Sequence, residues 1–198
     1  MKIFNHIPKE NIIAIVEYGS FVYGTANYQS DHDYTVIVKD KTAPDDQFIL
    51  SDGDYSIYEE SHFQKLLNNQ YISGIEAIFT PAHLVLMGSL SHFTYEVNHA
   101  KLREEFSKRA SNSFVKCKKK LSMETGEERI GLKSLYHSLR ILDYGIQLAK
   151  EGKIIDFGSC NHHYKRIFEI GPDWEALKAE FQPIYNDLSS QFRLVAPK

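Results

Sequence analysis

Cysteine is scarce in this sequence, and long apolar runs are absent from it. The two cysteines, Cys117 and Cys160, lie far apart and form no C-x-x-C pair, which favours a reducing compartment over a disulfide framework. No segment approaches the ~20 apolar residues of a membrane-spanning helix, and the N-terminus lacks the apolar stretch of a signal peptide. We therefore expect a cytoplasmic protein without a membrane partner, in its own cell or in that of a host.

An excess of charge of one sign is also missing. The formal net charge is −3 at pH 7, so the chain as a whole does not attract nucleic acid, and contact with a polyanion needs a local basic patch. Apolar residues make up 42% and charged residues 25% of the 198 residues, which is ordinary for a globular protein and argues against disorder. This length suits one sizeable domain, or a compact domain with a helical appendage.

The N-terminal half predicts short strands separated by turns. The apolar run 12–16 predicts a buried strand that leads into a Gly-Ser pair, and 21–28 has room for one or two helical turns. β-Branched and aromatic residues predict strands at 33–38 and 54–58, with a loop at 39–46 between them.

Helical signals begin late in this half. We expect Ser61 to cap a helix that runs to Leu67 and ends at Asn68-Asn69. Residues 74–79 fit a strand or a helix equally well.

Helix formers dominate the second half of the chain. Four apolar residues recur at helical spacing between 128 and 151, namely Leu135, Leu139, Leu142 and Ile146. Residues 174–192 predict another helix, interrupted or kinked near Pro183. The predicted fold class is α+β, with an α+β core over 1–95 and a helical C-terminal region over 96–198.

Two aspartates separated by one residue are the most informative feature of the chain. Alternation along the predicted strand places Asp31 and Asp33 on one face, with Cα atoms roughly 6–7 Å apart. Carboxylates this close repel one another unless a cation lies between them, and hard oxygen ligands suit Mg²⁺. A third carboxylate would complete a site for one or two ions. Asp54, which opens the next predicted strand, is our choice, and Asp52 remains an alternative.

A Gly-Ser pair precedes these aspartates by ten residues. Gly19 would let the backbone approach a phosphate, the following helical turn would present N–H groups, and Ser20 would add a hydroxyl donor. Phosphoryl chemistry needs such a donor-lined turn together with cations that neutralise charge on the oxygens. No P-loop, H-E-x-x-H or G-x-S-x-G motif competes with this interpretation.

This pattern resembles the signature of the polymerase-β-like nucleotidyltransferases. In that superfamily a Gly-Ser turn is followed by a D-x-D pair and by a third acid on a later strand, as Gly19-Ser20, Asp31-x-Asp33 and Asp54 follow one another here. The chain looks most like the small bacterial and phage predicted nucleotidyltransferases, and the resemblance covers most of residues 12–150. In those proteins an Asn-x-x-x-x-x-Glu segment and a K-x-x-x-H-x-x-R helix follow, which here correspond to Asn69–Glu76, with one residue more between the asparagine and the glutamate, and to Lys133, His137 and Arg140. The proline that usually follows the asparagine is absent.

The resemblance implies a fold, an activity and a set of site residues. The fold is a twisted mixed β-sheet backed by helices. The activity is two-metal transfer of a nucleoside monophosphate from an NTP such as ATP to an acceptor, with release of pyrophosphate and with Mg²⁺, or Mn²⁺ in its place, as cofactor. The acceptor stays open among RNA such as a tRNA end, a protein side chain and a small molecule. The implied metal ligands and catalytic residues are Asp31, Asp33 and Asp54; the implied nucleotide-binding residues are Gly19, Ser20, Lys133, His137 and Arg140.

Simpler interpretations remain open for several of these residues. Asp54 is nearly as compatible with a surface turn as with the role of the third acid. The three residues of the basic helix fall on one face, opposite the leucines, and would also suit an exposed charged surface. The lysines at 116 and 118–120 could meet an RNA backbone, but they suit a solvated helix surface better.

Two other functions compete with the enzyme. One is a catalytically inactive nucleotide-binding module, or a toxin–antitoxin type module, on the same fold; clustered acids favour the enzyme because a pure binder does not need them. The other is a structural nucleic-acid-binding protein, which the near-neutral charge disfavours.

Overall fold

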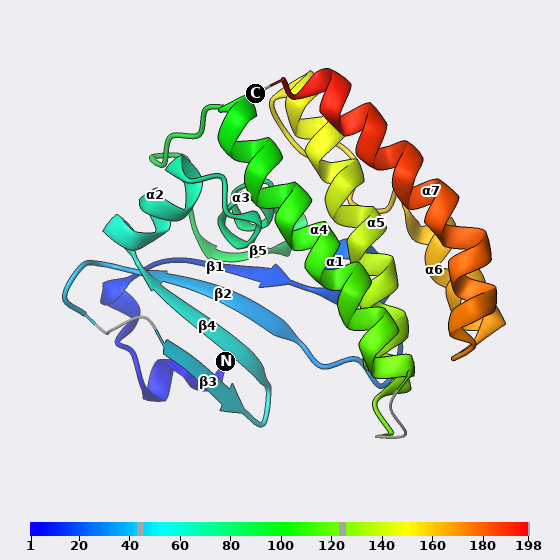
Figure 1. Ribbon diagram of the computed structural model, residues 1–198. Coiled ribbons are helices and arrows are strands. Elements are labelled where there is room, and N and C mark those ends of the chain that lie inside the picture. The colour runs from blue at the N-terminus through cyan, green and yellow to red at the C-terminus, as the bar shows by residue number, and fades with distance from the viewer. Residues whose placement is uncertain (43–45, 123–125, 198) are drawn as a thin grey trace. The chain divides into compact units, whose positions relative to one another are not determined.

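A computed structural model describes residues 1–42, 46–122 and 126–197, and the chain divides into two compact units, Met1–Glu96 and Val97–Lys198. The first unit contains a β-sheet and short helices, and the second is helical (Figure 1). This architecture confirms the predicted α+β class, a mixed sheet followed by a helical C-terminal half. No helix in the described ranges is long and apolar enough to cross a membrane.

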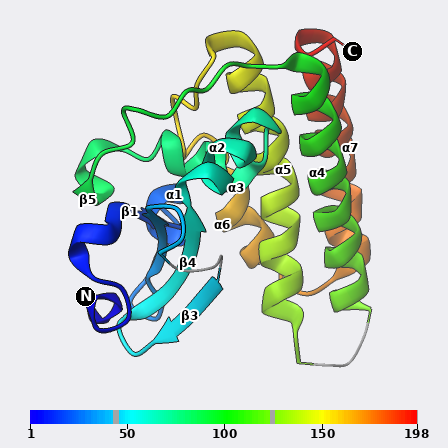
Figure 2. The same ribbon diagram turned by 90° about the vertical axis from the view of Figure 1, so that its left-hand side faces the viewer.

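Five strands form one sheet in the described part of the first unit, in the order β3-β4-β2-β1-β5. They are β1 (Ile12–Tyr18), β2 (Asp33–Val38), β3 (Asp46–Leu50), β4 (Gly53–Glu59) and β5 (Val85–Gly88). β2 and β4 run parallel, whereas the other neighbouring strands are antiparallel, so the sheet is mixed. Figure 2 shows β3 beside β4 at one edge of the sheet.

Both faces of the sheet are covered, because its central strands are apolar on both sides. On one face Val36 and Ile57 pack with Ile3 from the 3₁₀ turn Lys2–Asn5. On the other face, Ile37 packs with Phe63. The helices of the first unit are α1 (Ser20–Tyr23), α2 (Glu60–Asn68) and α3 (Ile72–Ile78), with further 3₁₀ turns at Lys9–Asn11 and Ala82–Leu84.

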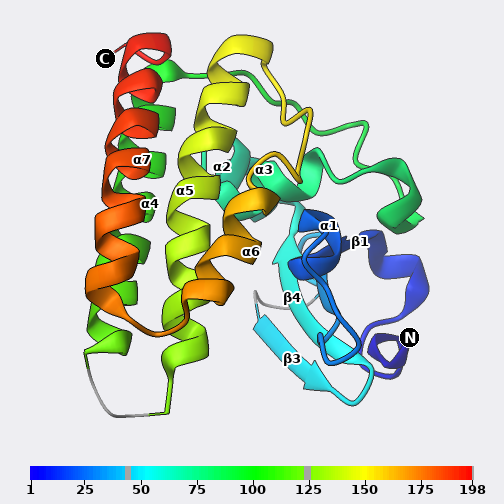
Figure 3. The ribbon, with the colours of Figure 1, turned by 90° about the vertical axis from the view of Figure 1, so that its right-hand side faces the viewer.

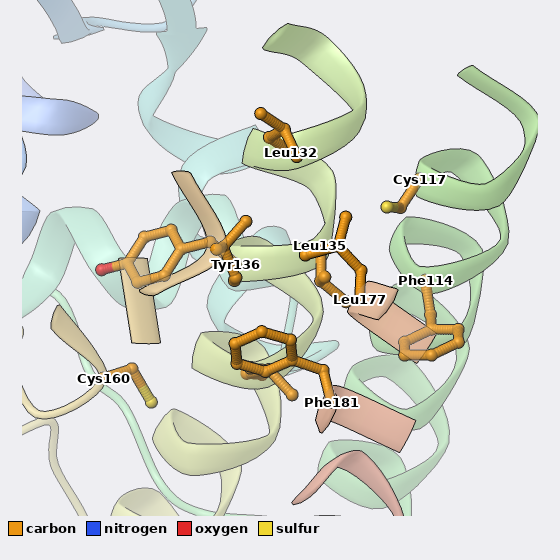
Figure 4. Packing of buried hydrophobic residues seen from close by; sticks show 10 residues of the cluster. Phe114, Cys117, Leu132, Leu135, Tyr136, Cys160, Leu177 and Phe181 are labelled. Atoms are coloured by element: carbon orange, nitrogen blue, oxygen red, sulfur yellow. The ribbon is translucent and has the colours of Figure 1, made fainter. Parts of the chain in front are cut away.

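The second unit consists of α4 (His99–Leu121), α5 (Glu128–Glu151), α6 (Asn161–Ile170) and α7 (Trp174–Val195). Figure 3 shows α4, α5 and α7 side by side, with α6 against α5 and α7. Their core includes the predicted leucines Leu135 and Leu139, and Figure 4 shows Leu135 with Leu177 and Phe181. 

Both cysteines are free thiols buried in the same core. Burial raises the pKa of Cys117 and of Cys160 to about 12. Each thiol is therefore protonated and unreactive at neutral pH.

The strands at 12–16, 33–38 and 54–58 are confirmed, but β3 was not predicted. The expected loop at 39–46 includes residues 43–45, which lie outside the described residues, and Asp46 already belongs to β3. β3 is a short edge strand with partly exposed side chains, so it lacks the apolar run that marks β1.

In three places the helices settle an ambiguity of the sequence or differ from the prediction. The ambiguous stretch 74–79 lies largely in α3. Ser61 is not an N-cap, because α2 begins at Glu60 and the Ser61 N–H donates to Asp40 Oδ1 at 2.8 Å. The C-terminal helix is not interrupted at Pro183, since α7 continues through it.

Candidate functional site

The Gly-Ser pair forms a tight turn between β1 and α1. Gly19 has φ +72° and ψ −143°, a conformation that side chains rarely adopt. A Cβ atom at Gly19 would lie 2.2 Å from Asp33 Oδ2. The lack of a side chain therefore lets the Asp33 carboxylate approach the backbone just before Ser20.

The short helix α1 is anchored from two sides. Its last residue, Tyr23, donates its hydroxyl proton to Glu76 Oε2 at 2.8 Å, and Glu76 is buried in α3. The carbonyl of Ser20 accepts the N–H groups of Thr25 and Ala26 at 2.9 and 3.1 Å. Glu76, which the resemblance singled out at the end of Asn69–Glu76, thus supports the turn that carries Ser20.

The aspartates meet through strand pairing. Asp33, the first residue of β2, is in register with Asp54 on the parallel strand β4. Paired residues on adjacent strands project to the same face of a sheet, and neighbouring strands lie about 4.8 Å apart. Asp31 precedes β2 by two residues and is exposed, while Asp33 and Asp54 are partly exposed. Two of the three proposed acids, Asp33 and Asp54, therefore lie side by side on adjacent strands.

Asp31 and Asp54 line a pocket of about 420 Å³ in the first unit. Its wall also includes Ser30, His32 and Ser51, so most of the lining groups are polar. Within the described ranges, no group of three or more His, Cys, Asp or Glu side chains is arranged to hold a metal ion. The carboxylates therefore do not form a closed ligand cage by themselves.

Asp52 differs from Asp54 in its surroundings. Asp52 lies in the turn before β4, and its Oδ2 accepts the backbone N–H of Lys2 at 2.7 Å. Desolvation alone would raise the pKa of Asp52, but the hydrogen bonds that it accepts, foremost from Lys2, lower it. Burial and then Asp52 itself raise the pKa of the Tyr55 phenol. Asp52 is thus engaged in tying the N-terminus to β4.

His32 and Glu17 belong to the same region, although neither was singled out from the sequence. His32 Nδ1 lies 2.6 Å from Glu17 Oε1, and the Glu17 side chain is only 9% exposed. The carbonyl of His32 accepts the Asp54 N–H at 2.8 Å. The signal that could have revealed Glu17 is its charge in the otherwise apolar segment Ile12–Tyr18.

The basic helix predicted from the resemblance lies on α5, in the second unit. Lys133 is exposed, but Arg140 is only 2% exposed, so the alternative of an exposed charged face is wrong for Arg140. Arg140 Nη2 lies 2.9 Å from His137 Nδ1, and its guanidinium lies 4.9 Å from the centroid of the Tyr144 ring. Burial, and then the charges of Arg140, Lys133 and Lys116, lower the pKa of His137 to about 3, so this imidazole is neutral.

The lysine run on α4 carries no comparable arrangement. Lys116, Lys118 and Lys119 are exposed, and Lys120 pairs with Glu127. These contacts agree with a solvated helix surface.

No family model and no curated protein matches the sequence. Among solved structures, the chain is similar to the spectinomycin adenyltransferase AAD(9) from Enterococcus faecialis, solved with ATP and spectinomycin. That match has a TM-score of 0.50 and 15% sequence identity over 97% of this chain and 96% of the other. A nucleotidyltransferase-like protein from Exiguobacterium sibiricum matches with a TM-score of 0.35 and 10% identity, over 97% of this chain and 72% of its own, which is too weak to support an argument. The chain therefore has a nucleotidyltransferase-type fold.

Replacement of Gly19 tests the close approach of Asp33. We expect Gly19→Ala to lower the free energy of unfolding by more than the roughly 1–3 kcal/mol of backbone strain, because the new Cβ would also overlap Asp33 Oδ2. Gly171→Ala is the matched control, since Gly171 has a similar backbone conformation (φ +77°, ψ −160°) but no atom within 4 Å of the added Cβ. Equal losses for the two variants in urea unfolding would show that Asp33 does not crowd Gly19.

Proposed function

We propose that this protein transfers a nucleoside monophosphate from an NTP to an acceptor hydroxyl and releases pyrophosphate. The observation that carries the proposal is the meeting of Asp33 with Asp54 in strand register, directly against the backbone of Gly19. A donor-bearing turn and a pair of carboxylates are the two parts that phosphoryl transfer requires. The nucleotidyltransferase-type fold supports the same reaction.

Asp31, Asp33 and Asp54 are the residues that would hold Mg²⁺, or Mn²⁺ in its place. Their oxygen donors fit such ions, and Mg²⁺ usually binds one or two carboxylates together with substrate phosphates, without a closed protein cage. When bound, the metal would neutralise charge on the transferred phosphoryl group.

The chain's own groups supply binding and proton transfer. The N–H groups at the start of α1 and the Ser20 hydroxyl would donate hydrogen bonds to the triphosphate, whose approach Gly19 permits. Asp54 and Asp52 both line the pocket, and we assign to Asp54 the acceptance of the proton of the attacking hydroxyl. Asp52 is the poorer candidate for this role, because its carboxylate already binds the N–H of Lys2.

Lys133, His137 and Arg140 would bind further phosphate oxygens of the NTP. Lys133 is an exposed point charge and would contact the phosphates first, whereas Arg140 is only 2% exposed and would have to become accessible to make a bidentate contact. The neutral His137 orients Arg140 through its Nδ1 atom.

ATP is the donor that we propose first, and a small molecule is the acceptor class, since the protein solved with this fold was crystallised with ATP and spectinomycin. The decisive experiment incubates the protein with each labelled NTP and Mg²⁺, separately with spectinomycin and related hydroxyl compounds, with total RNA and with total protein. Label in the small-molecule fraction supports the proposal, whereas label in RNA or protein reassigns the acceptor. NTP binding without any transfer would replace the enzyme by a nucleotide-binding module.

Asparagine at either aspartate of the D-x-D motif should abolish transfer. Asp31→Asn and Asp33→Asn each remove one ligand charge, and the relief of like-charge repulsion should leave the melting temperature unchanged or slightly higher. Transfer rates and thermal melts without metal measure the two effects. Near-wild-type turnover in both variants would refute the assignment, and a large loss of stability would indicate a structural role instead.

Alanine at Asp54 and at Asp52 should have opposite effects. Asp54→Ala should reduce kcat about 10²- to 10⁴-fold with little change in NTP affinity, as expected for loss of a general base. Asp52→Ala should leave kcat nearly intact and lower the melting temperature, because the Lys2 N–H loses its acceptor. If Asp52→Ala proves the inactive variant, Asp52 is the third acid.

Lys133 gives the cleanest test of the basic helix, because it is exposed and its removal leaves no buried charge. A charge-assisted contact is worth roughly 1.5–3 kcal/mol, so Lys133→Ala should weaken binding of a non-hydrolysable NTP about 10-fold or more. Lys119→Ala removes an equally exposed lysine from α4 and serves as the control. Equal affinities for both variants in isothermal titration would show that Lys133 does not contact the NTP.

A further inference from the structure

His32 contacts several parts of the candidate site in the first unit. Its ring stacks on Phe21 of α1 with centroids 4.1 Å apart and an interplanar angle of 11°. Its backbone carbonyl accepts the Asp54 N–H at 2.8 Å, and its position in the chain separates Asp31 from Asp33. One residue therefore contacts the helix that follows the Gly-Ser turn, separates the two aspartates of the D-x-D pair and binds the backbone of the third acid.

A buried carboxylate fixes this residue in place. Glu17 on β1 is paired in register with Tyr34 on β2, so its side chain lies on the face opposite Asp33 and Asp54. Its Oε1 lies 2.6 Å from His32 Nδ1. A buried carboxylate retains a partner because an unpaired charge there would be costly.

His32 lines the pocket, but its stacking argues against a nucleobase on the face of the His32 ring. Phe21 covers one side of the ring, and Tyr34 lies parallel to it at 5.9 Å with an interplanar angle of 4°. A nucleobase therefore has little room to stack on this imidazole. The ring is held as a spacer between α1 and the sheet.

We propose that Glu17 and His32 are positioning residues, whose contact holds the Gly-Ser turn, the D-x-D carboxylates and Asp54 in the geometry that metal and triphosphate require. This inference rests on the proposed function of the same site. Glu17 acts only through His32, since it lies on the other face of the sheet. Gly53 contributes to the same arrangement. A Cβ atom at this position would lie 2.5 Å from the His32 carbonyl oxygen that accepts the Asp54 N–H, so the lack of a side chain permits that hydrogen bond.

The test compares Glu17→Ala with two matched variants. Glu17→Gln keeps an acceptor for His32 Nδ1 and should restore function. Leu67→Ala removes a buried side chain from α2 without touching His32, and so controls for a general loss of stability. His32→Phe keeps the stacked ring but removes the donor, and replaces Glu17→Ala if that variant does not fold.

Two measurements follow, both well below the melting temperature. Loss of an outer partner of a metal ligand typically costs 10- to 100-fold in metal affinity or activity. Glu17 acts on Asp54 one contact further away, through His32, so Glu17→Ala should raise the Mg²⁺ concentration for half-maximal turnover about 10-fold, the lower end of that range, whereas Leu67→Ala and Glu17→Gln stay close to wild type. In the metal-free protein, amide hydrogen exchange should become faster in Glu17→Ala over 19–23, 31–33 and 53–55 together.

The outcomes separate this inference from the proposed function. If wild type transfers no nucleotide to any acceptor, the function fails, and hydrogen exchange alone decides the positioning role. Unchanged exchange in those three segments of Glu17→Ala, or an equal rise in Leu67→Ala, overturns the inference. An unchanged Mg²⁺ requirement in an active Glu17→Ala also overturns it.

Discussion

The contact between the Asp33 carboxylate and the backbone of Gly19 is the constraint on which the candidate site depends. It is possible only because residue 19 has no Cβ and adopts a positive φ. The contact joins the end of β1 to the start of β2, so the donor groups of the turn and the negative charge of the aspartates occupy one place. A phosphate bound there would be repelled by these carboxylates, and this repulsion is the physical basis for proposing a cation at the site.

Two buried glutamates near this contact, Glu17 and Glu76, are each paired with a residue of another part of the fold. Glu76 accepts a hydrogen bond from Tyr23 of α1. Glu17 contacts His32, whose ring stacks on Phe21 of α1, so both pairs support this helix. In the second unit, Arg140 lies against His137 and the Tyr144 ring. Removal of one partner of such a pair costs more stability than the pair contributes, because a buried charge is left behind. These residues therefore rigidify the molecule at the expense of tolerance to substitution.

The sequence predicted the elements whose signals are local. β1 and β2 were visible as apolar and β-branched runs, and α5 was visible from leucines at helical spacing. β3 escaped because an edge strand buries little apolar surface and leaves a weak pattern. The error at Ser61 has a tertiary cause, since Asp40 supplies the acceptor that a capping side chain would otherwise provide.

In the candidate site, too, the features with a local sequence signal could be predicted and those that depend on tertiary contacts could not. The Gly-Ser turn and the D-x-D pair could be recognised from spacing alone, and the strand that carries Asp54 from its composition. The register that brings Asp54 beside Asp33 could not be derived, nor could the contact between Glu17 and His32, because both join residues whose pairing no local periodicity encodes. Burial of Arg140 was missed for a related reason, since the helical pattern suggested an exposed face.

The parallel register of β2 with β4 also bears on how such a chain can change length during evolution. The hydrogen bonds between β2 and β4 hold Asp54 beside Asp33, whatever the length of the segment that connects the two strands. Extra residues between Val38 and Asp46 would lengthen a connection and leave the pair intact, since loop insertions cost little free energy. A single deletion between Asp54 and Glu59 would turn every preceding side chain of β4 to the opposite face. Insertions and deletions should thus accumulate before β3 and be excluded from β4.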